Sequence, residues 1–282
     1  MRREHLFEFE DLPWFPAVLR DGVTSFLTGL HRLLRTDEPL AGLLHRALEA
    51  GRAYERGRRR GHEAGGAEEE IVDLASGAGG PLPDVVRRLR EEHGRRVHAT
   101  LTDLRPNPRA AAALRATDDP AVRYLREPVD AARPPDDLEG SARTIVASLH
   151  HLPPSAARRA LHDARRSRTP IVVLELAHQL RPTSSALLVL PAAALLVLVL
   201  TPFLRPSWPQ LLFTYLVPVL PVVIAWDGAV SMLRIYSRRE LRAMLDGVDD
   251  PGYAWEMGSI RPPWLPLRMP YLLGLPRVSA TR

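Results

Sequence analysis

A glycine-rich turn carries the clearest chemical signal in this chain. The stretch from Ile71 to Pro81 contains three glycines and lies between a predicted strand and a predicted helix. Glycines let the backbone approach a ligand closely, and the start of the following helix offers N–H donors. Asp103, at the end of the next predicted strand, is placed to accept hydrogen bonds from a ribose diol. The pattern predicts a site for a nucleoside-containing ligand.

A dinucleotide site is the first alternative for this turn. Its fingerprint needs a third glycine where this chain has Leu82, and an acid about 20 residues after the glycines. Asp103 stands 26 residues beyond Gly77. We therefore reject the dinucleotide interpretation.

Three further residues are candidates for catalysis. His150 and His151 follow the end of a predicted strand, where an imidazole can act as a general base. The alternative is that one of them packs the loop and hydrogen-bonds to backbone. Asp227 follows an apolar run and is either an active-site acid or only the boundary of that run. The ten histidines show no ligand spacing such as H-E-x-x-H, so we expect no metal site.

The glycine turn resembles the first motif of class I S-adenosylmethionine (SAM)-dependent methyltransferases, which runs acidic-x-Gly-x-Gly-x-Gly. Asp73, Gly77 and Gly79 match it, and Ala75 stands where the first glycine is usual. In this resemblance Asp103 corresponds to the acid that binds the ribose. The resemblance covers residues 68–178 and 237–277.

Two later segments extend the resemblance. Pro128-Val129-Asp130 resembles the segment whose acid meets the adenine amino group, and Ser148 to Pro153 closes the fourth strand as in such enzymes. The resemblance implies SAM as cofactor, methyl transfer as the reaction, and no metal requirement. The implied cofactor-binding residues are Asp73, Ala75, Ser76, Gly77, Gly79, Asp103, Leu104, Asp130 and Ser148. For Asp73 the alternative is that its carboxylate only shapes the turn.

The elements that must position these residues alternate between short apolar runs and amphipathic helices, which predicts a parallel sheet. Together with the resemblance, which implies a Rossmann-like seven-stranded methyltransferase sheet, this predicts an α/β fold with an N-terminal helical cap and a hydrophobic helical hairpin insertion. Ser237 to Glu240 is a capping box that opens a late helix. Strands are predicted at 70–75, 97–103, 122–128, 144–149, 170–177, 253–261 and 269–276, the last two joined by a turn around Pro262-Pro263; helices are predicted at 82–93, 107–117 and 154–168.

The chain divides into four predicted parts. Apolar residues recur at helical spacing from Phe15 to Leu34 and from Leu40 to Leu48, and a hinge follows at Gly61, Gly65 and Gly66. We predict a helical cap at 1–66, a cofactor-binding core at 67–184, a hydrophobic hairpin at 185–228, and completion of the core at 229–282.

Composition excludes several chemistries. The 282 residues include no Cys and no Lys, so all 38 basic residues are Arg. Thiolate metal sites, Cys nucleophiles, Schiff bases and the P-loop Lys are excluded. The net charge of +5 permits an anionic membrane or nucleic acid as partner. The arginines at 56–60 lack a neighbouring motif of stacking aromatics, so we expect no nucleic-acid partner.

A nearly uncharged block interrupts the methyltransferase plan. Arg205 is its one formal charge between Ala186 and Trp226. Ser185 to Leu204 gives 20 residues, about 30 Å of helix, which is enough to cross a hydrocarbon core, whereas Leu211 to Trp226 gives 16. The flanking arginines favour a cytoplasmic catalytic domain. They are Arg181, Arg234, Arg238, Arg239 and Arg242.

Other interpretations of the block stay open. Prolines at 191, 202, 218 and 221 favour kinked or re-entrant segments over straight spanning helices. In a soluble enzyme the block would instead be a lid or a contact in a homodimer. The acidic N-terminus does not resemble a secretory signal, so we expect no export.

These observations predict a membrane-associated methyltransferase that acts on a hydrophobic or lipid-like small molecule. Oxygen is the expected acceptor atom because histidines are available as bases, and carbon is the alternative. A membrane-anchored protein that binds SAM or a related nucleoside without transferring methyl is a second interpretation, which Ala75 in the glycine position keeps open.

Overall fold

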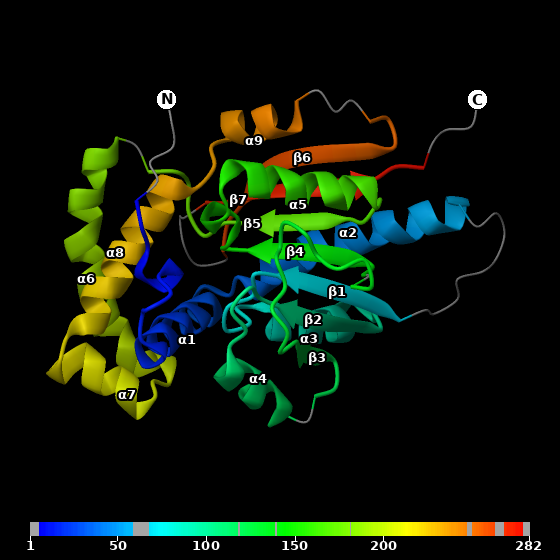
Figure 1. Cartoon of the computed structure of the whole chain (residues 1–282). Coiled ribbons are helices and arrows are strands. Elements are labelled where there is room, and N and C mark those ends of the chain that lie inside the picture. The colour runs from blue at the N-terminus through cyan, green and yellow to red at the C-terminus, as the bar shows by residue number, and fades with distance from the viewer. Residues whose placement is uncertain are drawn as a thin grey trace.

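The chain folds around one twisted sheet, seen in a computed structural model that describes residues 6–58, 68–117, 119–138, 140–180, 182–246, 250–262 and 268–278. Seven strands of this described part pair in the order β3-β2-β1-β4-β5-β7-β6. The first five are parallel, and β7 lies antiparallel between β5 and β6 (Figure 1). The strands are β1 (Glu69–Leu74), β2 (Val97–Thr102), β3 (Val122–Tyr124), β4 (Ala142–Val146), β5 (Ile171–Leu174), β6 (Tyr253–Ile260) and β7 (Met269–Pro276).

This architecture confirms the predicted α/β sheet and its closing antiparallel pair. The strands are apolar on both faces because helices cover both faces. Along β1, Ile71 belongs to one core cluster and Val72 to the other. The helices on the first face are α2 (Asp37–Arg58), α3 (Leu82–His93) and α4 (Pro108–Arg115); those on the second are α5 (Pro154–Arg166) and α9 (Arg238–Leu245).

Helix starts follow the local sequence. The side chain of Asn107 accepts hydrogen bonds from the backbone N–H groups of Arg109 and Ala110 and so begins α4. Ser237 and Glu240 form the predicted capping box at the start of α9. The hinge glycines, Arg181 and Pro263 lie outside the described residues.

The N-terminal helices differ from the single cap that the sequence predicts. Leu40, Leu44 and Leu48 of α2 are fully buried in the same core cluster as β1, β5 and β7. Their stripe fills the sheet face beside α3, so α2 is part of the core. α1 (Ala17–Leu34) instead packs in a separate apolar cluster with the hydrophobic block. Apart from this assignment of α2, the predicted division of the chain into four parts stays a prediction.

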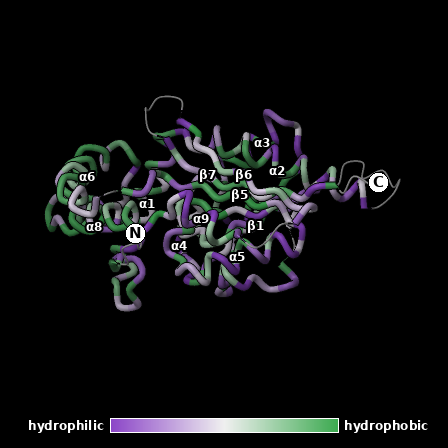
Figure 2. Tube along the Cα trace, turned by 90° about the horizontal axis from the view of Figure 1, so that it is seen from above, coloured by the Kyte–Doolittle hydropathy of each residue, from purple (hydrophilic) through white to green (hydrophobic). Residues whose placement is uncertain are grey.

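The hydrophobic block folds as two antiparallel arms beside α1. The first arm is α6 (Ala186–Leu200), continued by the turns η3 (Thr183–Ser185) and η4 (Thr201–Leu204). The second comprises α7 (Trp208–Leu211), a π-helical turn (Leu212–Leu216) and α8 (Val219–Arg234), with a bend of 89° before α8. α8 runs past the predicted end at residue 228. It lies against both α6 and α1, whereas α6 keeps a largely exposed, apolar outer face (Figure 2).

The length and hydropathy of Thr183–Leu204 would allow that segment to cross a membrane. Core helices of soluble proteins can pass the same test, although this one is only 11% buried over its most apolar window.

Two helical glycines should respond oppositely to substitution by alanine. A Cβ on Gly29 of α1 would lie 2.8 Å from the Leu204 Cβ, while a Cβ on Gly42 of α2 would meet nothing within 4 Å. Gly42→Ala should therefore raise the free energy of unfolding by about 0.5–1 kcal/mol. Gly29→Ala should lower it by about 1–3 kcal/mol because α1 must move away from the hairpin. Urea denaturation measures both, and equal responses would contradict this packing.

Candidate active site

A cavity of about 660 Å³ opens at the carboxyl ends of β1, β2 and β4. Parallel α/β sheets bind ligands at this edge. One wall is made by the turns after the strands and the other by α1 and the N-terminal segment, residues 6–15. Of the predicted cofactor-binding residues, those that line the cavity are Ala75, Ser76, Gly77, Asp103, Leu104, Asp130 and Ser148.

The glycine turn has left-handed backbone conformations where the motif predicts glycine. Ala75 has a φ of 57° and Gly77 one of 55°. For an alanine this conformation costs about 1–2 kcal/mol. The Ala75 carbonyl accepts a hydrogen bond of 2.8 Å from the Ser148 hydroxyl, which ties the turn to the end of β4. Ala75 thus takes the conformation that a glycine would have there.

Gly77 and Gly79 have different roles in this turn. A Cβ on Gly77 would meet nothing within 4 Å, so its backbone borders open space in the cavity wall. Gly79 has a φ of 94°, and a Cβ there would lie 3.1 Å from the Leu101 side chain. Gly79 does not line the cavity; it lets the turn pack on β2.

Asp103 holds the cavity-lining turns together. Its carboxylate accepts hydrogen bonds of 2.8 Å from the backbone N–H groups of Gly77 and Arg105. Asp130, on the turn after β3, accepts a hydrogen bond of 2.9 Å from the Ala132 N–H. Tyr124, which the sequence did not single out, donates a hydrogen bond of 2.7 Å to the Gly77 carbonyl. No periodicity or motif in the sequence distinguished this tyrosine from a core residue of β3.

Asp73 lies behind the cavity wall. It is 2% exposed, and its carboxylate accepts a hydrogen bond from the Thr144 hydroxyl. Its carbonyl accepts hydrogen bonds from Ser76 and Thr102. Burial raises the pKa of Asp73 to about 7. This placement agrees with the alternative that Asp73 shapes the turn.

The two candidate bases occupy different environments. His150 is 5% exposed and does not line the cavity; its Nδ1 lies 2.8 Å from Glu175 Oε2. His151 lines the cavity, with its Nδ1 3.0 Å from Asp11 Oδ1 and 3.4 Å from Glu8 Oε2. Burial lowers the pKa of His151, but the Glu8 and Asp11 carboxylates outweigh burial and raise it to about 9. In this state His151 carries a proton and donates hydrogen bonds, so it is not poised to act as a base.

The N-terminal segment is the part of the site that sequence reasoning missed. Arg234 of α8 is 2% exposed and binds Glu8 at 2.9 Å and Asp11 at 2.7 Å. Arg105 donates a hydrogen bond of 2.8 Å to the Asp11 carbonyl. The acidic residues that cluster within positions 8–11 were visible in the sequence, but nothing local connected them with a strand end far along the chain.

Asp227 anchors this segment. Its carboxylate accepts hydrogen bonds of 2.7 Å and 3.3 Å from the backbone N–H groups of Phe9 and Glu10. Asp227 does not line the cavity. Its position therefore differs from that of an active-site acid, which was one of the two interpretations of Asp227 in the sequence. Glu10 does line it, and burial raises the pKa of that carboxyl to about 8.

Comparisons with known proteins add resemblances at low identity. No family model matches the chain, and no curated protein matches it. The plantazolicin methyltransferase BpumL, in complex with a pentazolic desmethylPZN analog and SAH, has 9% identity and a TM-score of 0.47 over 92% of this chain and 98% of its own.

Two other solved structures are similar over less of their length. The citrinin polyketide synthase CMeT domain has 16% identity and a TM-score of 0.45, over 76% of this chain and 48% of its own. An O-methyltransferase family protein from Burkholderia thailandensis has 17% identity and a TM-score of 0.43, over 86% and 59%. This chain thus spans about half the length of these two structures. Independently of them, the strand order and the antiparallel β7 define a class I methyltransferase fold.

Asp73 should make the stability of the ligand-free protein depend on pH. Its folded-state pKa of about 7 exceeds the ordinary 3.8, so the folded chain holds this proton more tightly than the unfolded chain. The free energy of unfolding should therefore fall as the pH rises from about 4 to about 7. Asp73→Asn removes this titration and should reduce the fall by about 2–4 kcal/mol. Urea denaturation at both pH values measures it, with the exposed Asp137→Asn as control. An unchanged pH dependence in Asp73→Asn would contradict the burial.

Proposed function

We propose that this protein is a SAM-dependent methyltransferase that acts on an apolar acceptor at a membrane surface. The observation that carries the proposal is the cavity at the carboxyl ends of β1, β2 and β4, which brings the glycine turn, Asp103 and Asp130 together within the class I methyltransferase fold. These three features come from separate strands, and the methyltransferase resemblance assigns each of them to the same cofactor.

The residues present fit SAM. A side chain at position 77 would fill the open space beside Gly77, so the glycine leaves that space for a ligand. The left-handed backbone at Ala75 and Gly77 keeps the turn clear of the cavity. Asp103 would hold the ribose and Asp130 the adenine. When bound, SAM supplies a methyl group made electrophilic by its sulfonium.

The work left to the chain is positioning and exclusion of water. The N-terminal segment and α1 would form the wall opposite the cofactor turns and shield the reacting groups from solvent. A hydroxyl acceptor has to lose a proton, and the carboxyl group of Glu10, whose pKa burial raises to about 8, lines the cavity beside His151. This group favours oxygen as the acceptor atom, with carbon as the alternative.

The exposed hairpin face supports a membrane partner. Leu188 is 78% exposed, Phe203 76% and Leu216 77%. Soluble proteins seldom expose a contiguous apolar surface of this kind. The inner arm α8 carries Asp227 and Arg234 in polar contacts with the N-terminal segment, which favours shallow insertion of α6 and α7 over a spanning hairpin. The arginines that flank the block in the sequence favour the cytoplasmic side for the catalytic domain.

This arrangement suggests where an apolar acceptor would enter. α8 packs between α6 and α1, and α1 contributes Leu27 and Thr28 to the cavity wall. Only one helix layer would therefore separate the lipid-facing helix from α1. An acceptor dissolved in the membrane could reach the cavity along α1.

Substitution of Asp103 should weaken cofactor binding. Asp103→Ala removes both acceptors for the ribose diol and loosens the Gly77 turn, so the dissociation constant for SAM should rise at least tenfold, or about 1.4 kcal/mol. Isothermal titration with SAM and its demethylated product measures this, with Asp137→Asn as control. Transfer of labelled methyl from SAM into lipid extract distinguishes an enzyme from a binder. Unchanged affinity in Asp103→Ala would contradict the placement of the ribose.

Charge placed on the hairpin face should release the protein from membranes. Leu188→Glu with Phe203→Glu removes two apolar side chains from the lipid contact, so binding to vesicles that contain anionic phospholipid should fall more than tenfold. Flotation measures it. Val278→Glu, at an exposed position beside Gly57 near the end of α2, should float like the unaltered chain. The contrary outcome has two parts: the unaltered chain stays in the aqueous phase as a dimer, and the double variant is a monomer. That outcome would identify the exposed face as a dimer contact instead.

A further inference from the structure

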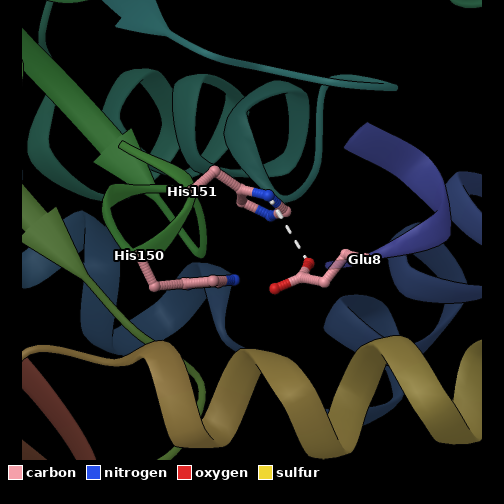
Figure 3. Close-up of side chains that lie close together, drawn as sticks. All are labelled: Glu8, His150 and His151. Atoms are coloured by element: carbon pink, nitrogen blue, oxygen red, sulfur yellow. Dashed lines mark ion pairs between the residues drawn. The ribbon is translucent and has the colours of Figure 1, made fainter. Parts of the chain in front are cut away.

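Three side chains that the methyltransferase resemblance does not assign to cofactor binding converge at the edge of the cavity. Glu8 comes from the N-terminal segment, and His150 and His151 come from the turn η2 (Leu149–His151) at the end of β4. One nitrogen or oxygen from each residue lies within 4.8 Å of the other two (Figure 3). Glu8 and His150 are buried, and His151 borders the cavity.

Two of the three converging groups, His150 and Glu8, are held from behind by another residue. Glu175 accepts from the backbone N–H of His150 at 3.1 Å and binds its Nδ1 at 2.8 Å, which orients the other ring nitrogen toward Glu8 (Figure 3). Arg234 binds Glu8 Oε1 at 2.9 Å, and Glu8 Oε2 faces His151. A carboxylate behind a histidine is the usual support of a metal ligand, because it fixes the tautomer and the ring orientation.

Carboxylates gather around this point. Asp11, Glu175 and Asp227 lie beside the three converging groups, and Arg234 contacts Glu8 and Asp11. The two imidazole rings lie with their centroids 4.3 Å apart and their planes tilted by 34°. Buried carboxylates need compensation by paired cations or metals. A divalent cation would supply that compensation.

We propose that Glu8, His150 and His151 form a binding site for a divalent transition-metal cation, with Zn²⁺ as its best-suited occupant. Two imidazole nitrogens and one carboxylate oxygen are a donor set that Zn²⁺ favours, whereas Mg²⁺ and Ca²⁺ prefer oxygen alone. On binding, the cation would displace the proton that His151 carries in the metal-free protein. The cation would fasten the N-terminal segment to the end of β4 and would be accessible from the cavity. The sequence analysis expected no metal site, because Glu8 is far along the chain from the two histidines.

Zn²⁺ alone, titrated calorimetrically into the full-length protein after chelator treatment, tests the site. We expect one Zn²⁺ per chain by elemental analysis, with a dissociation constant of about 1 μM or below, and a raised melting temperature. Glu8→Gln and His151→Asn should each weaken binding at least tenfold. Glu175→Gln, which leaves the contacts of Glu8 in place, should weaken it about 10–100-fold. His162→Asn, on α5 and bonded to the Met244 carbonyl, is the matched control.

Absence of bound Zn²⁺, or equal affinity in Glu8→Gln, His151→Asn and the unaltered protein, would overturn the proposal. Circular dichroism of each variant establishes that it is folded before its affinity is compared. SAM titration is a separate readout. A chain that binds Zn²⁺ but not SAM would contradict the proposed function and support the metal site. A chain that binds SAM but not Zn²⁺ would contradict the metal site and leave the proposed function unaffected.

Discussion

The site depends on one ion-pair network around the buried Arg234. Arg234, at the end of the hydrophobic hairpin, reaches both Glu8 and Asp11, and the Asp11 carboxylate also contacts His151 at the end of β4. A buried guanidinium is costly unless its partners are in place. Three segments far apart in sequence are therefore fixed together, and the N-terminal segment becomes a wall of the cavity.

This network gives the hydrophobic hairpin a structural role in the site. α6 presents the exposed apolar face, α8 carries Arg234 and Asp227, and α1 reaches the cavity. Small residues permit that close stacking, since Gly22 and Gly29 of α1 face Leu220 and Leu204. A surface suited to lipid and a cavity suited to a cofactor are thus connected through packed helices.

The sequence predicted the sheet well because its strands are short, apolar and bounded by turns. The glycine turn and Asp103 were recognisable because their chemistry depends on local spacing. The role of His151 was not, because its protonation depends on Glu8 and Asp11 at the other end of the chain. The role of Asp227 also depends on a segment far away in the sequence, because its carboxylate binds the backbone of residues 9 and 10. From the sequence alone it could only be described as an acidic residue at the end of an apolar run. Helix α2 looked like part of a cap because its amphipathic stripe does not say which surface it covers.

The most direct test of the account is a crystal structure of the full chain soaked with the demethylated product of SAM. The account predicts density in the cavity, with the ribose hydroxyls on Asp103 and the adenine beside Asp130. Density at another place, or a cavity that stays empty while the crystal is saturated with the ligand, would contradict it.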